Sequence, residues 1–487
     1  MTHGLEKAIL ILTNTKGGGS TAGERQEKGG EGGRSEGVTR CEERRERMLK
    51  RFLIIGLLAG LSLAAFGQPL EVWLSVTFAE SFNEAIREMV LEWSKKTGVE
   101  VNLVLLPDKI FNEKLINAIE TRITPDITLV TEFGDALAYE AGLLVPLDDL
   151  VDRLGREDFW PQALEVMYLP DPATGEMHIW ALPIIMEPFY WHIRTDLLKA
   201  AGIEVPEYPT WDWLINAAYK VNRPPHRYGL GIGFGVGWDT PTTLYFLVAL
   251  YGGGFVTDIS PNGADIFNAE PTWRLFADLK KWWKDKLIPP DAIAWADIDN
   301  NLAFMEGRVM CILNPTTVLA TMVRQDHILL PGTGVINIPP VIEAKESILV
   351  FRSTPEREAL AKDLLYYILS DKERLRVEIC DKAAMYGMPI FKSQGEIMSQ
   401  KIRAREGVYQ YALHDLVEPI RRGEFYMWCN TVPFPYGKAH PAWEAITSAQ
   451  TEWNRFMTKL LLEDADPKEV AAEMAAWMNS ILAKWSK

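Results

Sequence analysis

Short apolar runs alternate with segments of helical apolar spacing near the start of the globular part of this sequence. Strands are predicted at Leu70–Thr77, Val99–Leu105 and Ile127–Val130. The segments between them, Glu84–Lys96 and Phe111–Thr121, carry apolar residues on one helical face, as amphipathic helices do. Strands that alternate with helices in this way predict a parallel sheet with helices on both faces. The chain is therefore expected to have an α/β fold.

In a parallel sheet of this kind, ligands lie beyond the carboxyl ends of the strands. Three loops follow the predicted strands, at Phe78–Ser81, Leu106–Lys109 and Thr131–Asp135. We therefore expect these loops to border a ligand-binding cleft. The last of them leads into a short predicted helix at Asp135–Glu140.

The first 47 residues differ from the rest of the chain. They are rich in Gly, Glu, Arg and Lys and poor in aromatic residues, so they cannot form a core. Glu42–Arg47 contains only Glu and Arg, as a purine-rich ribosome-binding site would if it were read as protein, and Met48 follows directly. We interpret residues 1–47 as an upstream extension that is not translated in the native precursor. A disordered natural segment is the alternative.

Residues 48–67 have the pattern of a signal peptide. A basic pair, Lys50-Arg51, precedes an apolar run, Phe52–Phe66, and small residues mark a cleavage site before Gln68. The run is shorter than the roughly 20 apolar residues that span a hydrocarbon core. We expect cleavage near Gly67/Gln68 and a mature protein in the periplasm or outside the cell. Because no Cys follows the apolar run, we expect no lipid anchor.

Charge and cysteine content exclude several classes of function. The formal net charge is −15 at pH 7, and so acidic a surface repels nucleic-acid phosphates and anionic lipid. Three of the four Cys remain after residue 67. These three, Cys311, Cys380 and Cys429, are too widely spaced for a metal motif, and their odd number leaves at least one free thiol. We expect these three cysteines to be core residues, and we expect no metal and no cofactor.

The roughly 420 residues after position 67 are more than one hydrophobic core usually supports, which predicts two lobes.

The recognisable catalytic and nucleotide-binding motifs are not found. The glycine-rich passage Gly229–Gly237 is followed by no Gly-Lys-Ser/Thr sequence and lacks the strand–turn–helix context of a dinucleotide site. The chain has seven His, without an HExxH motif or a Ser-His-Asp order. We therefore expect a binding protein and not an enzyme. A secreted glycosidase, with two carboxylates across the scissile bond, is the alternative from another class.

One later stretch combines features of a ligand cleft. An apolar run, Leu182–Met186, meets the carboxylate Glu187. The aromatic segment Pro188–Tyr190 then leads into a predicted helix that stops at Gly202, and Thr210 is expected to cap the next helix. A carboxylate and aromatic side chains at the end of a strand-like run predict a cleft for a polar ligand.

Several short motifs occur in one order along nearly the whole chain after residue 67. They are TPDI at 124–127, AGLLVPLDD at 141–149, RTDLL at 194–198, FMEGRVM at 304–310, EREALAKDLLYYILSDKER at 356–374, GMP at 387–389 and, near the end, Trp443, Asp466-Pro467 and Met478-Asn479. In this order they resemble the maltose-type, sugar-binding family (family 1) of extracellular solute-binding proteins of ABC transporters.

The resemblance implies the type II periplasmic-binding-protein fold, in which two hinge-linked α/β lobes with parallel-rich sheets close on a ligand. Lobe 1 would comprise residues 68–186 plus 343–384, and lobe 2 residues 187–342 plus 385–487. The crossovers between the lobes would fall near Ile185–Glu187, Ile338–Ser347 and Met385–Pro389.

The resemblance also implies a function. The protein would capture a sugar or oligosaccharide by closure of two lobes, as a monomer, and deliver it to the permease subunits of an ABC importer. Binding of a polyamine or a glycerol phosphodiester on the same fold is the alternative. The acidic residues Glu80, Glu132, Asp135 and Glu187 would suit a polyamine. A phosphate site needs converging Arg or Lys, which the predicted loops lack.

A sugar needs planar aromatic faces for its C–H patches and amide or ionised groups for its hydroxyls. The chain has 17 Trp, and those at predicted cleft loops are candidates. By the resemblance, Trp443 matches a stacking aromatic and Glu187 a sugar-contacting carboxylate. Pro315-Thr316 stands where relatives often have an aromatic residue, which argues against a stacked long maltodextrin. The predicted ligand-binding residues are Glu80, Glu132, Phe133, Asp135, Glu187, Trp238, Asp239, Asn314 and Trp443.

Overall fold

The computed structural model describes residues 68–77, 79–131, 134–165, 167–427 and 440–486. The chain divides into two units, Met1–Gln68 and Pro69–Lys487, and nearly all described residues belong to the second. The predicted upstream extension (1–47) and signal peptide (48–67) lie outside the described residues. In the part of the chain that the structure describes, no helix has the length and apolar character needed to cross a membrane.

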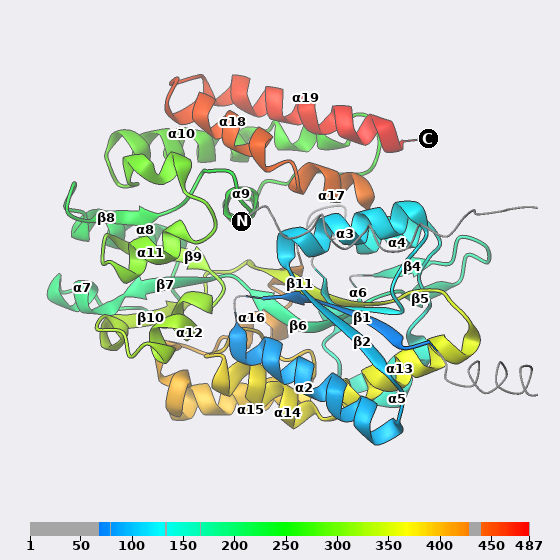
Figure 1. Ribbon diagram of the computed structural model, residues 1–487. Helices are drawn as coiled ribbons and strands as arrows, with labels where there is room; N and C mark the ends of the chain where they lie inside the picture. The colour runs from blue at the N-terminus through cyan, green and yellow to red at the C-terminus, as the bar shows by residue number, and fades with distance from the viewer. Residues whose placement is uncertain (1–67, 78, 132–133, 166, 428–439, 487) are drawn as a thin grey trace, which may run out of the picture. The chain divides into compact units, whose positions relative to one another are not determined.

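Six strands form the larger sheet (Figure 1). β1 pairs in parallel with both β2 and β3, so the predicted parallel arrangement of the first three strands is confirmed. β11 joins β3 and β6 in antiparallel orientation, and β12 lies at the edge beyond β11. The strands are β1 (Leu70–Val76), β2 (Val101–Pro107), β3 (Ile127–Thr131), β6 (Leu182–Pro188), β11 (Val341–Val350) and β12 (Phe425–Met427).

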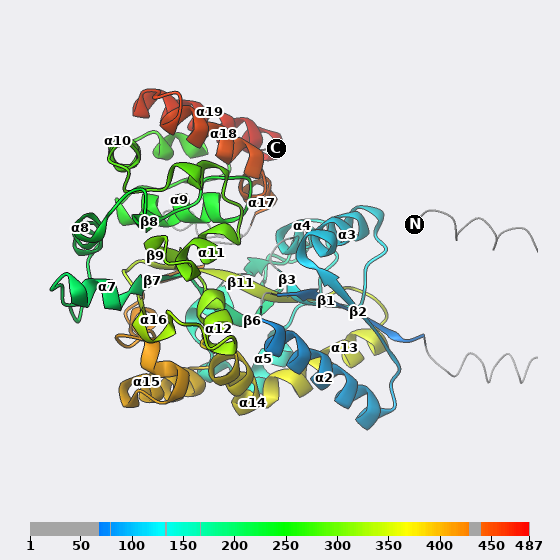
Figure 2. The ribbon, with the colours of Figure 1, turned by 60° about the vertical axis from the view of Figure 1, so that its left-hand side comes forward.

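Helices cover both faces of this sheet, as the strand–helix alternation predicts. In Figures 1 and 2, α3 and α4 lie on one face and α2, α5 and α13 on the other. α2 packs there because Phe82, Ile86 and Trp93 are buried and recur at helical spacing. The helices are α2 (Glu80–Thr97), α3 (Asp108–Thr121), α4 (Asp135–Glu140), α5 (Asp148–Leu154) and α13 (Pro355–Ser370).

A second sheet has four strands, in the order β10-β7-β9-β8. Its strands are β7 (Tyr190–Arg194), β8 (Tyr228–Gly231), β9 (Val309–Asn314) and β10 (Thr333–Ile336). The expectation that the aromatic segment leads directly into a helix is wrong, because residues 190–194 form β7 and the helix begins only at Thr195. Every residue of β7 is buried, since the strand lies between β9 and β10, and aromatic and β-branched side chains favour such a position.

The remaining elements connect and cover the two sheets. The Thr210 hydroxyl accepts a hydrogen bond of 3.2 Å from the Trp213 N–H, which confirms the predicted cap. The helices are α6 (Pro161–Glu165), α7 (Thr195–Ala200), α8 (Trp211–Val221), α9 (Asp239–Leu250), α10 (Glu270–Lys284), α11 (Asp299–Met305), α12 (Thr317–Arg324), α14 (Lys372–Arg376), α15 (Lys392–Ala404), α16 (Glu418–Arg421), α17 (Pro441–Thr447), α18 (Gln450–Leu461) and α19 (Pro467–Trp485). The short elements are β4 (Tyr168–Pro170), β5 (Met177–Ile179), η1 (Arg156–Asp158), η2 (Gly263–Phe267), η3 (Pro290–Ala294), η4 (Leu330–Gly332), the π-helical η5 (Val377–Lys382) and η6 (Gly407–Tyr411).

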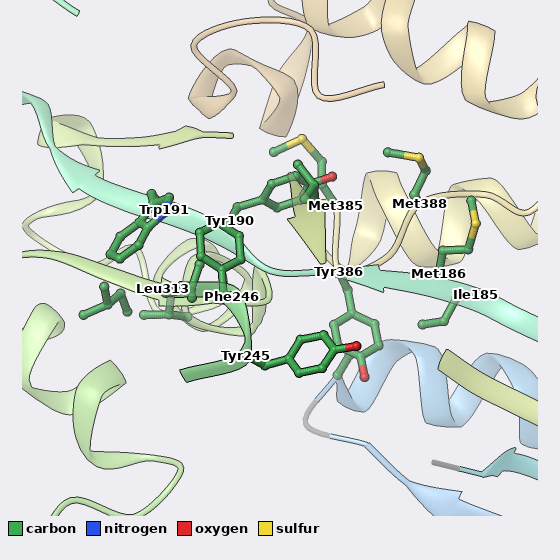
Figure 3. Packing of buried hydrophobic residues seen from close by; sticks show 14 of the residues in the cluster. Ile185, Met186, Tyr190, Trp191, Tyr245, Phe246, Leu313, Met385, Tyr386 and Met388 are labelled. Atoms are coloured by element: carbon green, nitrogen blue, oxygen red, sulfur yellow. The ribbon is translucent and has the colours of Figure 1, made fainter. Parts of the chain in front are cut away.

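The three segments predicted to cross between lobes are hydrogen-bonded neighbours. β6 and β11, which contain two of them, pair antiparallel through residues 185–188 and 343–346. The third meets β6 where Met186 and Met388 exchange backbone hydrogen bonds of 3.1 and 2.7 Å (Figure 3). The three segments therefore lie side by side at the boundary between the two sheets. The lobe boundaries themselves stay a prediction.

β3 contains an unusual backbone conformation. Val130 has a φ of 60°, in the left-handed region that a β-branched residue rarely adopts. The pairing with β11 is irregular at the same place, since Ser347 faces Thr131 whereas Leu349 faces Thr128. This is a β-bulge, which leaves one residue of β3 unmatched and redirects the strand. It does so directly before the loop predicted to contact ligand.

We expect the protein with glycine at position 130 to be more stable than the protein with alanine there. A left-handed backbone costs an L-residue about 1–2 kcal/mol but costs glycine nothing. Glycine also loses the buried Cβ and has more freedom in the unfolded chain, which offsets part of this cost. The Val130→Gly variant should therefore exceed Val130→Ala in free energy of unfolding by roughly 0.5–1 kcal/mol. Urea unfolding of the two variants measures the difference. In an ordinary strand, the alanine variant is more stable than the glycine variant. If that order were found here, it would contradict the left-handed conformation of residue 130.

Two of the three cysteines are core residues, as the sequence analysis expects. Cys311 and Cys380 are buried free thiols, and burial raises the pKa of each. A thiol held in its neutral form is a poor nucleophile. Cys429 lies outside the described residues.

Candidate ligand-binding site

The amino end of α4 and the helix α17 meet where β3 ends. The Glu444 carboxylate oxygen Oε1 accepts hydrogen bonds from the backbone N–H groups of Gly134 (3.1 Å) and Ala136 (3.3 Å). Glu444 is only 9% exposed, and Asp135, between the two donors, is completely buried. Gly134 has a φ of 91°, and a Cβ there would lie 3.1 Å from Leu115 Cδ2. A glycine therefore lets the loop turn close to α3.

An aromatic cluster anchors α17 against α9. The Trp443 ring lies 5.6 Å from that of Tyr245 and 5.7 Å from that of Phe255, measured between centroids. Tyr245 and Phe255 themselves stack at 5.0 Å. Trp443 is 1% exposed, so both of its faces are covered by protein in this conformation. Figure 3 shows Tyr245 among the buried residues between the two sheets.

A chain of buried polar side chains connects α9 with the end of β9. The Asn300 amide donates to Asp239 Oδ2 at 2.5 Å, and the Asn314 amide donates to Asn300 Oδ1 at 2.9 Å and to Asn301 Oδ1 at 2.7 Å. Asp239, Asn300 and Asn314 are all buried. Burial raises the pKa of Asp239 well above its usual range, and the charges of Asp297 and Asp299 raise it further. Carboxylate and amide groups in such an array match the hydrogen-bonding needs of hydroxyl groups.

Asp297 holds the amino end of α9. Its Oδ1 accepts a 3.0 Å hydrogen bond from the backbone N–H of Asp239, and burial raises the pKa of Asp297. The same carboxylate lies against Gly237, where a Cβ would collide with it. The glycine-rich passage therefore lets a carboxylate approach the backbone. Trp238 is half-buried between these groups.

Two buried carboxylates lie on neighbouring strands at the boundary between the sheets. Glu187 of β6 is opposite residue 344 of β11, two positions before Glu346, so both glutamates are on the same face. Both are buried. The Tyr386 hydroxyl donates a 3.1 Å hydrogen bond to Glu346 Oε1, and Figure 3 shows Tyr386 beside the segment that crosses there. Two of the three predicted crossover segments therefore carry a buried acidic side chain.

Comparison with known proteins identifies the family. Residues 79–374 match the bacterial extracellular solute-binding proteins. This chain belongs to that family. A mannitol-binding protein of Pseudomonas aeruginosa is 26% identical over 159 residues, 32% of this chain and 33% of that protein. The match thus spans about a third of the relative's length.

Solved structures of solute-binding proteins share the fold. A sugar transporter protein of Arthrobacter chlorophenolicus A6 with bound laminaribiose has a TM-score of 0.66 at 17% identity, covering 85% of this chain and 99% of that one. A solute-binding protein of Agrobacterium vitis S4 with bound D-mannitol has a TM-score of 0.64 at 16% identity, covering 86% and 99%. The periplasmic-binding-protein fold expected from the sequence is therefore confirmed.

In this solute-binding protein, the fold brings several predicted site residues together. Asp239 and Asn314 are linked through Asn300, and Trp238 directly precedes Asp239 in the chain. Asp135 and Trp443 adjoin the hydrogen bonds that Glu444 makes. Glu187 lies at the crossover of the sheets. Their role in ligand binding stays a prediction.

The other predicted residues are placed differently. Glu80 is 84% exposed at its side chain and forms an ion pair of 3.1 Å with Arg324 on α12. Glu132 and Phe133 lie outside the described residues. Two surface hollows, of about 490 and 740 Å³, contain none of the predicted site residues. Among the described residues, no three His, Cys, Asp or Glu side chains are grouped so as to hold a metal ion.

The structure adds polar residues that the sequence analysis does not single out, namely Asn300, Asn301, Glu346 and Glu444. Asn300 and Asn301 precede a quoted motif, and Glu444 follows Trp443 directly. Of the four, only Glu444 is next to a candidate residue, and the other three have no such local signal. Their partners are far away in the chain, with Glu444 and Gly134 separated by 310 residues.

Proposed function

We propose that this solute-binding protein captures an uncharged sugar or sugar alcohol and delivers it to the permease of an ABC importer. The chain of buried polar groups from Asp239 through Asn300 to Asn314 is the observation that carries the proposal. It begins at the first residue of α9, the helix that also carries Tyr245 of the aromatic cluster, and it ends at the carboxyl end of β9. Ligands of α/β proteins bind at the carboxyl ends of strands. The mannitol-binding relative and the laminaribiose-bound and mannitol-bound structures support this class of ligand.

Ligand entry requires the two lobes to separate. The candidate side chains now bond to one another and to backbone, so a ligand has to replace some of these contacts with its own hydroxyls. Lobe 1 is residues 68–186 plus 343–384, and lobe 2 is 187–342 plus 385–487. Both would turn about the three adjoining crossover segments. Ligand then stabilises the closed form by its higher affinity for that form.

The proposed ligand-binding residues are Asp135, Glu187, Trp238, Asp239, Asn314 and Trp443, together with Glu80, Glu132 and Phe133. The protein acts as a monomer, does not alter its ligand, and needs no cofactor. It is secreted after cleavage near Gly67/Gln68 and carries no lipid anchor. ATP hydrolysis belongs to other subunits of the importer.

The alternatives have less support. A glycerol phosphodiester needs free backbone donors or basic side chains. At the amino end of α4, the donors of Gly134 and Ala136 are already bonded to a carboxylate. A polyamine or a glycosidase has no counterpart among the relatives described above.

Thermal unfolding with a ligand panel tests the proposal. D-mannitol, D-glucose, maltose and laminaribiose are compared with spermidine and glycerophosphoglycerol. A ligand present at about 100 times its Kd adds roughly 2.7 kcal/mol of stability, which raises the Tm measurably. We expect at least one neutral sugar or sugar alcohol to do so and to be recovered unchanged. A shift only with spermidine or with the phosphodiester would contradict the proposal, as would no shift at all.

A paired substitution tests the site. Asp239→Ala removes a buried carboxyl group that can bond to ligand hydroxyls, and we expect the affinity for the identified ligand to fall at least about tenfold. Asp212→Ala, on the exposed first turn of α8, is the control and should bind as the wild type does. Isothermal titration calorimetry measures both. If Asp239→Ala and Asp212→Ala bound the ligand with equal affinity, Asp239 would not be a ligand-binding residue.

A further inference from the structure

One exposed ion pair joins helices that belong to different sheets. Glu80 is the first residue of α2 and Arg324 the last residue of α12, and the Glu80 Oε2 and Arg324 Nη1 atoms are 3.1 Å apart. The two residues are separated by 244 positions in the chain. α2 covers the six-stranded sheet, whereas α12 follows β9 of the four-stranded sheet (Figure 2). The ion pair therefore spans the boundary between the two proposed lobes.

Each of these helices is fixed to its own side of the boundary by buried apolar residues. α2 buries Phe82 and Ile86, and α12 buries Val318, Leu319 and Met322. α12 also contacts α11 and η4, which precede β9 and β10 in the chain. Because protein interiors are closely packed, neither helix can move far without the elements it packs against. The distance between the two charged groups therefore depends on how the two lobes are placed relative to each other.

The two charged side chains serve each other. Among the described residues, the Glu80 carboxylate and the Arg324 guanidinium have no other ion-pair partner. Both side chains are exposed. An exposed pair adds little to the stability of the fold, because water screens it and two long side chains lose their freedom. A small free energy is enough, however, to shift an equilibrium between two conformations of a folded protein.

We propose that Glu80 and Arg324 form a latch that stabilises the closed form of the protein. This inference rests on the proposed function, in which the two lobes separate before a ligand enters. The ion pair breaks when the lobes separate, so it stabilises the closed form and not the open one. Ligand affinity then includes the contribution of the latch. Glu80 is thus a positioning residue that acts through Arg324, and it needs no contact with the ligand.

A double-mutant cycle tests the latch. The variants are Glu80→Gln, Arg324→Gln and the double variant that combines them. The controls are Glu270→Gln and Arg274→Gln, because these two residues form an exposed ion pair within the single helix α10. The controls change the net charge in the same way but connect no two lobes. Calorimetry with the neutral ligand found in the sugar panel measures the affinities, and small-angle X-ray scattering measures the radius of gyration of the unliganded proteins.

We expect each substitution in the latch to weaken ligand binding about two- to fivefold, which is the effect of one exposed ion pair. The double variant should bind no more weakly than either single variant, because both substitutions remove the same interaction. Raising the NaCl concentration from about 0.02 to 0.5 M should weaken binding by the wild type more than by Arg324→Gln, since salt screens the pair. The control variants should bind, and respond to salt, as the wild type does.

Two measurements are needed because the unliganded protein has its own balance of open and closed forms. If it is mostly open, loss of the latch lowers the affinity, and if it is mostly closed, the loss increases its radius of gyration. No change in either measurement would overturn the inference. Weaker binding by Glu80→Gln but not by Arg324→Gln would also overturn it, because that result indicates direct contact of Glu80 with the ligand. A wild type that binds none of the sugars in the panel contradicts the proposed function itself, which separates the two failures.

Discussion

Replacing Asp126 by alanine is expected to lower the free energy of unfolding by about 3 kcal/mol. The buried Asp126 carboxylate accepts from Arg357 Nε at 2.8 Å and also pairs with the second arm of that guanidinium. It further accepts a 2.7 Å hydrogen bond from the backbone N–H of Glu71. Alanine would leave a partly buried charge and a backbone donor without their acceptor. Urea unfolding measures the loss.

A double-mutant cycle separates the ion pair from the backbone contact. Asp126→Asn keeps an acceptor for the Glu71 N–H but removes the charge, and Arg357→Met removes the other partner. The ion pair should appear as a coupling free energy of about 1–3 kcal/mol between the two substitutions. Additive effects would show that Arg357 contributes nothing specific.

Local patterns predicted the parallel part of the larger sheet. Apolar runs and amphipathic helices alternate between residues 70 and 131, and β1, β2 and β3 pair as that alternation requires. Caps were also predictable, since Thr210 and Asp466 both bond to the first turn of the helix that follows. Each of these signals lies within a few residues of the structure it predicts.

What the sequence could not predict depends on distant partners. The sequence analysis expects a helix directly after Tyr190, whereas residues 190–194 form β7. These residues are a strand because they lie between β9 and β10, which are far away in the chain. The role of Asp126 was missed for the same reason, since Arg357 is 231 residues away. The left-handed Val130 has no sequence signal either, because a valine in an apolar run looks like any other strand residue.

The candidate site shows the same division. Asp239 follows the glycine-rich passage and Asn314 follows an apolar run, and the two predicted residues share one hydrogen-bond chain. The residue that links them, Asn300, has no signal in the sequence, and the carboxylate of Glu444 has only the candidate Trp443 beside it. A single sequence shows which side chains are polar. It does not show which of them end up buried against one another.

Acidification between pH 6.5 and pH 3 should destabilise the protein through two buried histidines. Burial lowers the pKa of His192 to about 3. Burial lowers the pKa of His414 to about 4, although the charge of Asp415 acts in the opposite direction. In the unfolded chain both titrate near pH 6.5. The unfolded state therefore binds more protons in this range, and stability falls as the pH falls.

His192 has surroundings that explain the shift. It lies in β7 opposite Ile312 of β9 and Val335 of β10, and its ring meets Phe304 at 6.4 Å between centroids. These neighbours are apolar and offer the imidazolium ion no compensating charge. One unit of pKa shift corresponds to about 1.4 kcal/mol. At pH 4.5, two units below the unfolded pKa, His192 should account for a loss of about 2.7 kcal/mol.

Comparison with a variant isolates this contribution, because other groups titrate in the same range. Asp239 and Asp297, whose pKa values are raised by burial, take up protons in the folded state and so stabilise it on acidification. They act equally in His192→Leu, which has no imidazole at that position. Between pH 7 and pH 4.5 the wild type should therefore lose about 2.7 kcal/mol more than His192→Leu. The exposed His226→Leu variant should follow the wild type, and identical pH profiles for all three proteins would show that His192 is protonated without cost.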